Sequence, residues 1–156
     1  MGAVQGHMSH LYDNPNLRFG QIKDILNKAS TGELIGTEKT DGQNIMLSYN
    51  IKDGTARASR NKGHFKQGGL TPDELQAFFG GRGDLEHSFA DSFRAFEQMA
   101  QNLPLESQLK LFGPEANIYY NAEVQDPRTS NVINYDVATL TTVSYTHLRA
   151  HETDSY

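Results

Sequence analysis

Apolar residues recur along this chain at two spacings, and each spacing predicts a different kind of element. A set near the N-terminus recurs at helical spacing and precedes Gly32, which predicts an amphipathic helix over residues 17–30. Its members are Phe19, Ile22, Ile25, Leu26 and Ala29. Residues 1–16 carry no such pattern, and we expect them to form an irregular N-terminal segment.

The second spacing is alternation, which is typical of strands. Ile45, Leu47 and Tyr49 alternate with polar or flexible residues, and a second run, 55–61, follows Asp53-Gly54. An Asp-Gly pair between two such runs predicts a hairpin, because these residues tolerate the positive φ angles of a type I′ turn. With Asp53 and Gly54 as the two turn residues, Leu47 would face Arg60. The return strand would then bring Arg60 and Asn61 close to Asn44.

The middle of the chain reads as a loop followed by helices. Residues 62–70 are rich in glycine and lysine and predict a loop. Thr71, Pro72 and Glu74 have the spacing of a helix cap, and Gly80 to Gly83 should end that helix. Asp84 is then expected to cap a long helix that ends before Pro104. Its apolar stripe is typical of a core: Leu85, Phe89, Phe93, Phe96, Met99 and Leu103.

The remaining elements complete the predicted fold class. A short helix is expected near Leu105–Leu111, and strands are expected over Ile118–Gln125 and Val132–Val137. Strands joined by hairpins, with amphipathic helices beside them, predict an α+β fold with an antiparallel sheet and packed helices.

Composition narrows the classes of function. The chain has 156 residues and a formal net charge of −5, so any contact with nucleic acid must be local. It has no cysteine, which excludes disulfides and thiolate metal sites. Because it also lacks a long apolar run or a signal-peptide pattern, we expect a cytoplasmic protein with no membrane contact. We also expect it to be a monomer.

Lys39, next to Asp41 and Gly42, is the first candidate for chemistry. A lysine amine is a nucleophile only when it is deprotonated, which requires burial or nearby positive charge. A run of cations on and after the predicted return strand is well placed to supply that charge or to hold polyphosphate: Arg57, Arg60, Lys62, His64 and Lys66. Glu123 lies in an otherwise apolar strand, where a carboxylate must accept hydrogen bonds or bind a cation.

Each of these features also has an ordinary structural interpretation. Asp-Gly is common in turns, a preceding lysine is often solvated, and a basic run is often a solvated loop. Glu123 alone is compatible with the exposed face of its strand. The functional interpretation depends on the conjunction of Lys39, Arg60 and Glu123, which should converge on one cleft.

The residues at these positions resemble the motifs of covalent nucleotidyltransferases, the superfamily of ATP-dependent RNA and DNA ligases and capping enzymes. The segment from Glu38 to Asn44 (EKTDGQN) is similar to the nucleotidyl-lysine motif, in the form Glu-Lys-x-x-Gly-x-Asn of the RNA-ligase branch. Ser59-Arg60-Asn61 resembles the second motif, and Tyr120 to Glu123 resembles the third. Residues 10–135 also resemble phage-encoded proteins of this superfamily.

The resemblance implies a polynucleotide ligase that uses ATP and Mg²⁺. Lys39 would form a lysyl-AMP intermediate, with Asp41 as a second candidate catalytic residue. Glu38, Asn44, Arg60 and Glu123 would bind the nucleotide, and Tyr135 is a candidate to stack on adenine. The AMP would pass to a nucleic-acid 5′-phosphate end, in the cytoplasm of an infected host cell if the gene belongs to a phage.

Two motifs of the family, a Glu-Gly strand and a Lys-x-Lys, do not follow Glu123. Residues 143–156 are similar in part to translated adapter DNA from sequencing libraries, so we expect them to be an artefactual or disordered, unpacked tail. Residues 17–142 would then be a partial adenylation domain with little or no activity. The alternatives are a non-catalytic relative that binds nucleotide or nucleic acid, and a phage structural domain.

Overall fold

The computed structural model describes residues 11–36 and 40–147, and these divide between two compact units. The smaller unit, Gln5–Lys39, contains a 3-10 turn at Leu11–Asp13 and the helix α1, Phe19–Ser30. The predicted N-terminal helix is therefore confirmed. None of the described residues of α1 is buried, and Phe19 is 91% exposed. The unit boundary lies between Lys39 and Thr40, whereas the sequence suggested one near residue 16.

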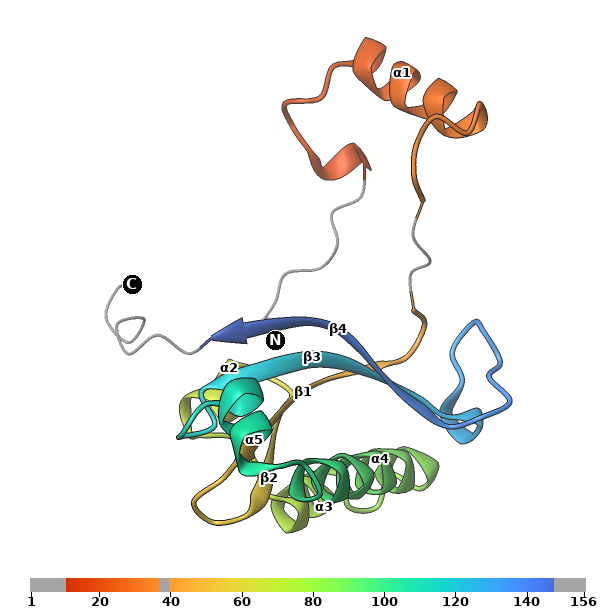
Figure 1. The fold of residues 1–156 in the computed structure, drawn as a ribbon. Helices are drawn as coiled ribbons and strands as arrows, with labels where there is room; N and C mark the ends of the chain where they lie inside the picture. The colour runs from red at the N-terminus through yellow and green to blue at the C-terminus, as the bar shows by residue number, and fades with distance from the viewer. Residues whose placement is uncertain (1–10, 37–39, 148–156) are drawn as a thin grey trace. The chain divides into compact units, whose positions relative to one another are not determined.

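The larger unit is built on a four-stranded antiparallel sheet (Figure 1). Its strands are β1 (Gln43–Asn50), β2 (Thr55–Ser59), β3 (Ile118–Gln125) and β4 (Thr139–His147), in the order β2-β1-β3-β4. Helices pack on this sheet, so the α+β fold class is confirmed. The predicted bounds of β3 are also correct.

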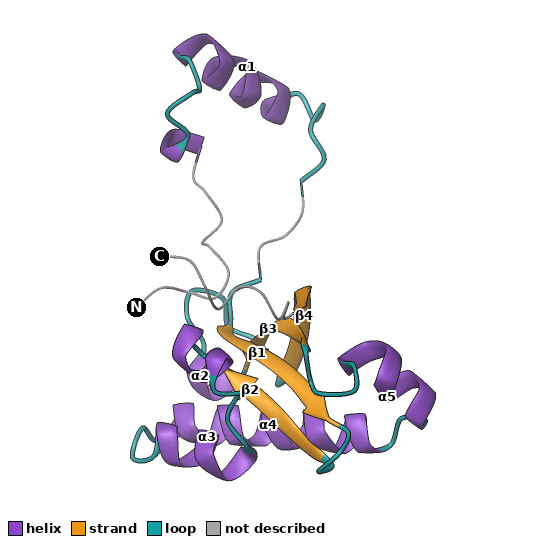
Figure 2. Ribbon diagram, turned by 90° about the vertical axis from the view of Figure 1, so that its left-hand side faces the viewer, coloured by secondary structure: helices purple, strands orange, loops and turns teal. Residues whose placement is uncertain are grey.

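Helices α3 (Pro72–Phe79) and α4 (Asp84–Gln101) cover one face of the sheet, which we call the helix side (Figures 1 and 2). The Thr71 side chain accepts from the Glu74 N–H and the Glu74 side chain accepts from the Thr71 N–H, which confirms the predicted cap. The residue before α4 is Gly83 at φ 58°, so Asp84 begins the helix and does not cap it. Helix α5 spans Leu105–Phe112, as expected.

The core lies between the helix side of the sheet and these three helices. The aromatic stripe of α4 is largely buried there, as predicted, although Met99 is 47% exposed. Phe79 and Phe89 stack with ring centroids 4.3 Å apart and an interplanar angle of 5°. The buried strand residues on this side come from alternate positions: Ile45, Leu47, Tyr49, Ala56, Ala58, Ala122 and Val124.

The opposite face of the sheet is covered in part by α2 (Lys62–Lys66), a short helix where the sequence predicted only a loop. The Asn61 side chain caps α2 by accepting from the His64 N–H at 2.9 Å. Phe65 then packs against Tyr119 with ring centroids 4.7 Å apart. Gly69, at φ +83°, lets the chain pass close to Tyr119, whose hydroxyl would lie 2.7 Å from an added Cβ.

The β1–β2 hairpin forms with a different register from the predicted one. Leu47 pairs with Ala58 instead of Arg60, so Asn50 and Thr55 close a four-residue loop. Side chains stabilise this longer loop: Asn50 Oδ1 accepts from the Lys52 N–H, and Asp53 Oδ1 accepts from the Thr55 N–H. The type I′ turn was therefore wrong, because the polar side chains supply an alternative that periodicity does not show.

The last strand also differs from the prediction. Residues 132–137 form no strand, and β4 begins at Thr139. β4 continues to His147, and its backbone pairs with β3 as far as Ile118, with a bulge between Asn121 and Ala122. The expectation of an unpacked tail is thus wrong for residues 143–147, whose backbone pairs with β3. Val143 and Thr146 are β-branched, which favours a strand. Residues 148–156 lie outside the described part of the chain.

Candidate functional site

Gly42 fixes the segment that follows Lys39, residues 40–44, against β3; we call these residues the lysine segment. Its N–H donates to Glu123 Oε2 at 2.8 Å. A Cβ at this position would lie 2.8 Å from the Val124 carbonyl oxygen and 3.0 Å from Glu123 Cβ, so only glycine fits without displacing β3. The glycine of the motif is therefore required by packing, and its N–H holds Glu123 two residues after Thr40.

Asp41 holds the loop that precedes β4. Its Oδ2 accepts from the N–H groups of Val132 and Ile133 at 2.7 and 2.8 Å. In return, the Asp41 N–H donates to the Tyr135 hydroxyl at 3.1 Å. Tyr135 thus lies beside the lysine segment, with its hydroxyl engaged by the backbone. The Asp41 carboxylate acts as a loop anchor in this arrangement, which makes it a positioning residue.

Asn44 and Glu123 share the face of the sheet opposite the helix side. They are directly paired across β1 and β3, and the side-chain amide of Asn44 donates to Asn121 Oδ1. All three side chains are partly or fully exposed. This face therefore presents a carboxylate between amide groups, which is a suitable set of acceptors and donors for sugar hydroxyls or a nucleobase.

Arg60 approaches the same segment from the helix side. Its Nη1 donates to the Asn44 carbonyl oxygen, so the predicted return of Arg60 to Asn44 is confirmed despite the changed register. Its guanidinium carbon lies 4.9 Å from the centroid of Phe89 and 5.8 Å from that of Phe79. Burial, together with the charge of Arg82, lowers the pKa of Arg60 from its ordinary value.

The candidate residues come together only in part. Glu38 and Lys39 lie outside the described residues. Asp41, Asn44, Arg60 and Glu123 all lie in or contact the segment Asp41–Asn44. However, Arg60 and Glu123 reach it from opposite faces of the sheet, which differs from the single cleft that the sequence suggested. The cause is strand alternation, because Arg60 follows Ser59 and side chains of adjacent residues face opposite ways.

The described residues contain no group of three histidine or acidic side chains arranged to hold a metal ion. Near the lysine segment, Asp41 is committed to two backbone N–H groups, while Glu123 Oε2 accepts from one. Magnesium in nucleotide sites is commonly held by one or two carboxylates together with substrate phosphates. Glu123 fits the first part of such a set, and the phosphates would have to complete it.

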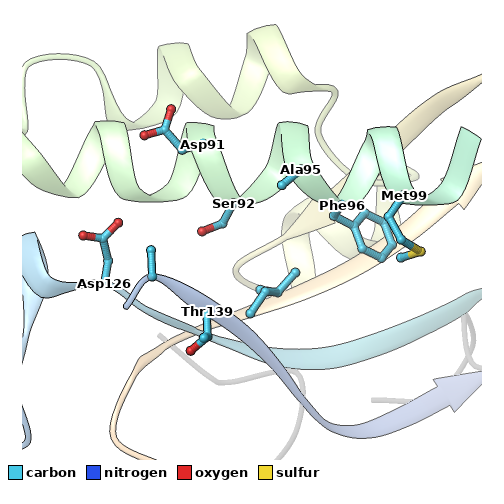
Figure 3. Close-up of a pocket in the computed structure, with 9 residues that line it drawn as sticks. Asp91, Ser92, Ala95, Phe96, Met99, Asp126 and Thr139 are labelled. Atoms are coloured by element: carbon cyan, nitrogen blue, oxygen red, sulfur yellow. The ribbon is translucent and has the colours of Figure 1, made fainter. Parts of the chain in front are cut away.

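A pocket of about 420 Å³ opens elsewhere, between α4 and the start of β4 (Figure 3). Asp91 and Asp126 lie toward one end of it, while Phe96, Met99 and Leu140 supply apolar walls. Arg128 donates to both carboxylates, at 2.9 and 2.6 Å, so this end is already charge-paired. None of the candidate residues lines this pocket. Sequence reasoning missed it because its residues come from three separate segments.

Arg82 is a second residue that the sequence did not single out. Its guanidinium carbon lies 5.6 Å from the centroid of Phe78 and 5.5 Å from that of Phe79. Phe79 therefore has both Arg60 and Arg82 beside it. The only signal in the sequence was the Gly80-Gly81-Arg82-Gly83 segment, which reads simply as a helix break.

No protein-family model matches this chain, and no curated protein or solved structure matches it either. Among the described residues, no helix combines the length and apolar character needed to cross a bilayer.

Proposed function

We propose that this chain is the nucleotide-accepting part of an ATP-dependent polynucleotide ligase, with Lys39 as the nucleophile. The observation that carries the proposal is the hydrogen bond from the Gly42 N–H to Glu123. It joins the lysine segment to a strand glutamate far along the chain, and these are two of the three elements whose motifs resemble the ligase superfamily. The partners in that bond are separated by 81 positions, so sequence proximity does not produce it.

In the first step, the deprotonated Lys39 amine attacks the α-phosphorus of ATP. A P–N bond forms, the bond from the α-phosphorus to the β-phosphate oxygen breaks, and pyrophosphate leaves with its electron pair. The AMP then passes to a 5′-phosphate end, and a 3′-hydroxyl displaces it to form the phosphodiester. In this proposal Glu123 and Asn44 hold the nucleoside, and Mg²⁺ neutralises phosphate charge when it is bound.

The test begins with the gene. The coding sequence is read past the codon for Thr142, and the protein that it encodes is produced. We expect the Glu-Gly and Lys-x-Lys motifs to follow, because the lysines of the latter would lower the pKa of the nucleophile. An intact gene that lacks both motifs overturns the proposal.

The second stage is incubation of that protein with α-labelled ATP and magnesium. We expect covalent label that acid releases and base does not, as for a phosphoramidate. Lys39→Ala should abolish it, whereas Lys110→Ala, which removes an equal charge from α5, should leave it unchanged. Glu123→Gln keeps an acceptor for Gly42 and should reduce labelling while preserving the fold. Label that persists in Lys39→Ala contradicts the assignment.

A non-catalytic nucleotide-binding protein is the second candidate, and two contacts favour it. The Asp41 carboxylate is occupied by the loop at Val132 and Ile133, and Arg60 is engaged by Asn44 and by aromatic rings. Neither group would then take part in turnover. Saturable ATP binding without covalent label, in a protein that carries all the motifs, would establish this alternative.

A further inference from the structure

Two arginine side chains lie beside the same aromatic ring on the helix side of the sheet. Arg60 and Arg82 both lie beside the Phe79 ring, with guanidinium carbons 5.8 and 5.5 Å from its centroid. Within residues 11–36 and 40–147, neither guanidinium forms an ion pair, whereas Arg57 and Arg128 each do. Two like charges held together in this way destabilise each other unless an anion lies between them.

Aromatic rings fix both guanidiniums in place. Arg60 also lies over Phe89, and Arg82 also lies over Phe78. These rings belong to α3 and α4, and Phe79 and Phe89 are almost fully buried. A guanidinium that is oriented by a rigid ring loses less conformational entropy when its N–H groups bind an anion. The two arginines are therefore preorganised for a ligand with several negatively charged oxygens.

The loop that carries Arg82 leaves it accessible from solvent. Gly81 and Gly83 have φ angles of +77° and +58°, and no atom lies within 4 Å of where a Cβ would stand at either position. Arg82 itself is exposed. Two acids follow in the first turn of α4, Asp84 and Glu86, and neither forms an ion pair with Arg82 in the described part of the chain. Glu86 accepts from the Gly81 N–H at 2.9 Å. Its carboxylate is thus engaged by the backbone and does not neutralise the arginine pair.

Further cations lie on α2, which contacts α3 through His64 while its Phe65 packs on the opposite face of the sheet. His64 packs edge-on against Phe78, the same ring that Arg82 covers, with centroids 4.8 Å apart. Lys62 and Lys66 are exposed on the same short helix. A protein of net charge −5 has no general attraction for polyanions, so this concentration of cations at one corner is a local feature. Two arginines and two lysines are more cations than one phosphate needs, and such a set suits a chain of phosphates.

We propose that Arg60 and Arg82 form a phosphate-binding site for the backbone of a single-stranded nucleic acid, with Lys62 and Lys66 continuing the path. That the arginine pair binds phosphate is argued from its geometry alone. Only the identity of the strand, as the one being joined, rests on the proposed ligase function. Planar guanidinium forks suit phosphate oxygens, and backbone contacts of this kind are independent of base sequence. Arg82 is the new element, because the lysine, arginine and glutamate motifs do not include it.

The experiment measures binding of a fluorescent single-stranded oligonucleotide to the 156-residue chain by anisotropy, without ATP, over a range of salt concentrations. Arg82→Gln should weaken binding about fivefold at ~0.1 M salt and reduce the slope of log affinity against log salt by about 0.7, as expected for one lost contact. Arg82→Lys, which keeps the charge but not the planar fork, should have an affinity between those of the unaltered chain and Arg82→Gln. Oligonucleotides of different sequence should lose the same factor.

Arg94→Gln is the matched control, because Arg94 is also an exposed arginine on the α3–α4 pair but donates to Gln76 at 2.8 Å. It should change the affinity and the salt slope less than Arg82→Gln does. Equal effects of the two variants, or no binding by the unaltered chain, would overturn the proposal. Because ATP is absent, a failure of Lys39 to accept nucleotide leaves this result unaffected, and the two proposals can fail separately.

A competition arm separates the two sources of phosphate. Unlabelled ATP should leave the oligonucleotide bound at this site if the site takes a strand. Displacement by ATP in the unaltered chain, lost in Arg82→Gln, would assign the pair to the nucleotide's own phosphates and overturn the assignment to a strand.

Discussion

Two corners of the larger unit carry arginine, and the groups around the guanidiniums differ. Arg128 donates to Asp126 and Asp91, and its own N–H also donates to Asp126 Oδ1 at 2.9 Å. Arg60 and Arg82 have aromatic rings beside them, and Arg60 has the Asn44 carbonyl as its acceptor. The first corner is therefore neutralised from within the chain, while the second retains two positive charges.

The contrast separates two uses of the same side chain. A guanidinium with carboxylate partners stabilises the fold, because removing it leaves buried negative charge behind. A guanidinium without them contributes little to the fold and keeps its capacity for an external anion. The free energy of unfolding should therefore respond strongly to changes at the Asp126 corner and weakly to changes at the Arg60–Arg82 corner.

The largest effect is expected at Asp126, which is 2% exposed. Asp126→Asn keeps an acceptor for the Arg128 N–H but removes the charge, and it should lower the free energy of unfolding by about 1–2 kcal/mol. Urea unfolding at neutral pH measures it. If Asp126→Asn changes the free energy of unfolding less than the exposed Arg94→Gln does, the Asp126 corner does not stabilise the fold and the comparison of the two corners fails.

The contribution of Asp126 to the free energy of unfolding should also depend on pH, in a direction that its pKa fixes. The hydrogen bond from the Arg128 side chain lowers the pKa of Asp126 despite its burial. The unfolded chain therefore takes up the proton first, with a pKa of about 3.9. Stability from this group is fully present above that pH and is lost as the pH falls through the lower folded value. Asp126→Asn should make the acid unfolding curve shallower, and an unchanged curve would contradict the assignment.

A smaller effect is expected at Arg60. Arg60→Met keeps most of the apolar stem but loses the ring contacts of the cation and the hydrogen bond to Asn44. It also removes a partly buried charge that Arg82 repels, and losing that charge offsets part of the lost stabilisation. We expect the free energy of unfolding to change by no more than about 1 kcal/mol. A loss larger than that of Asp126→Asn would show that Arg60 is primarily a structural residue.

These corners also show what sequence can predict. Local signals were sufficient where the deciding interactions lie within a few residues, as at the Thr71 cap, α1 and the aromatic stripe of α4. The return of Arg60 to Asn44 was predicted as well, because a hairpin fixes it approximately under either register.

Local sequence patterns gave the wrong structure where side-chain contacts outside the pattern determine it. Residues 132–137 have the apolar, β-branched composition of a strand, yet the Asp41 carboxylate takes two of their N–H groups and holds them as a loop. The hairpin register was changed by the side chains of Asn50 and Asp53. The opposite approach of Arg60 and Glu123 to the lysine segment follows from strand alternation under either register, together with the pairing of Glu123 with Asn44 across β1 and β3, which periodicity alone does not give.

The smallest effect on stability is expected at Arg82, whose glycine-flanked loop is exposed. Arg82→Gln should change the free energy of unfolding by less than about 0.5 kcal/mol in chloride buffer. Replacing chloride with inorganic phosphate at equal ionic strength should then raise the melting temperature of the unaltered chain more than that of the variant, because an anion that binds only the folded state stabilises it. Asp126→Asn changes the corner at Arg128, not the Arg60–Arg82 corner, so phosphate should raise its melting temperature as much as that of the unaltered chain. Equal shifts in the unaltered chain and Arg82→Gln would mean that the unpaired corner does not bind phosphate, and the distinction between the two corners would then be one of stability alone.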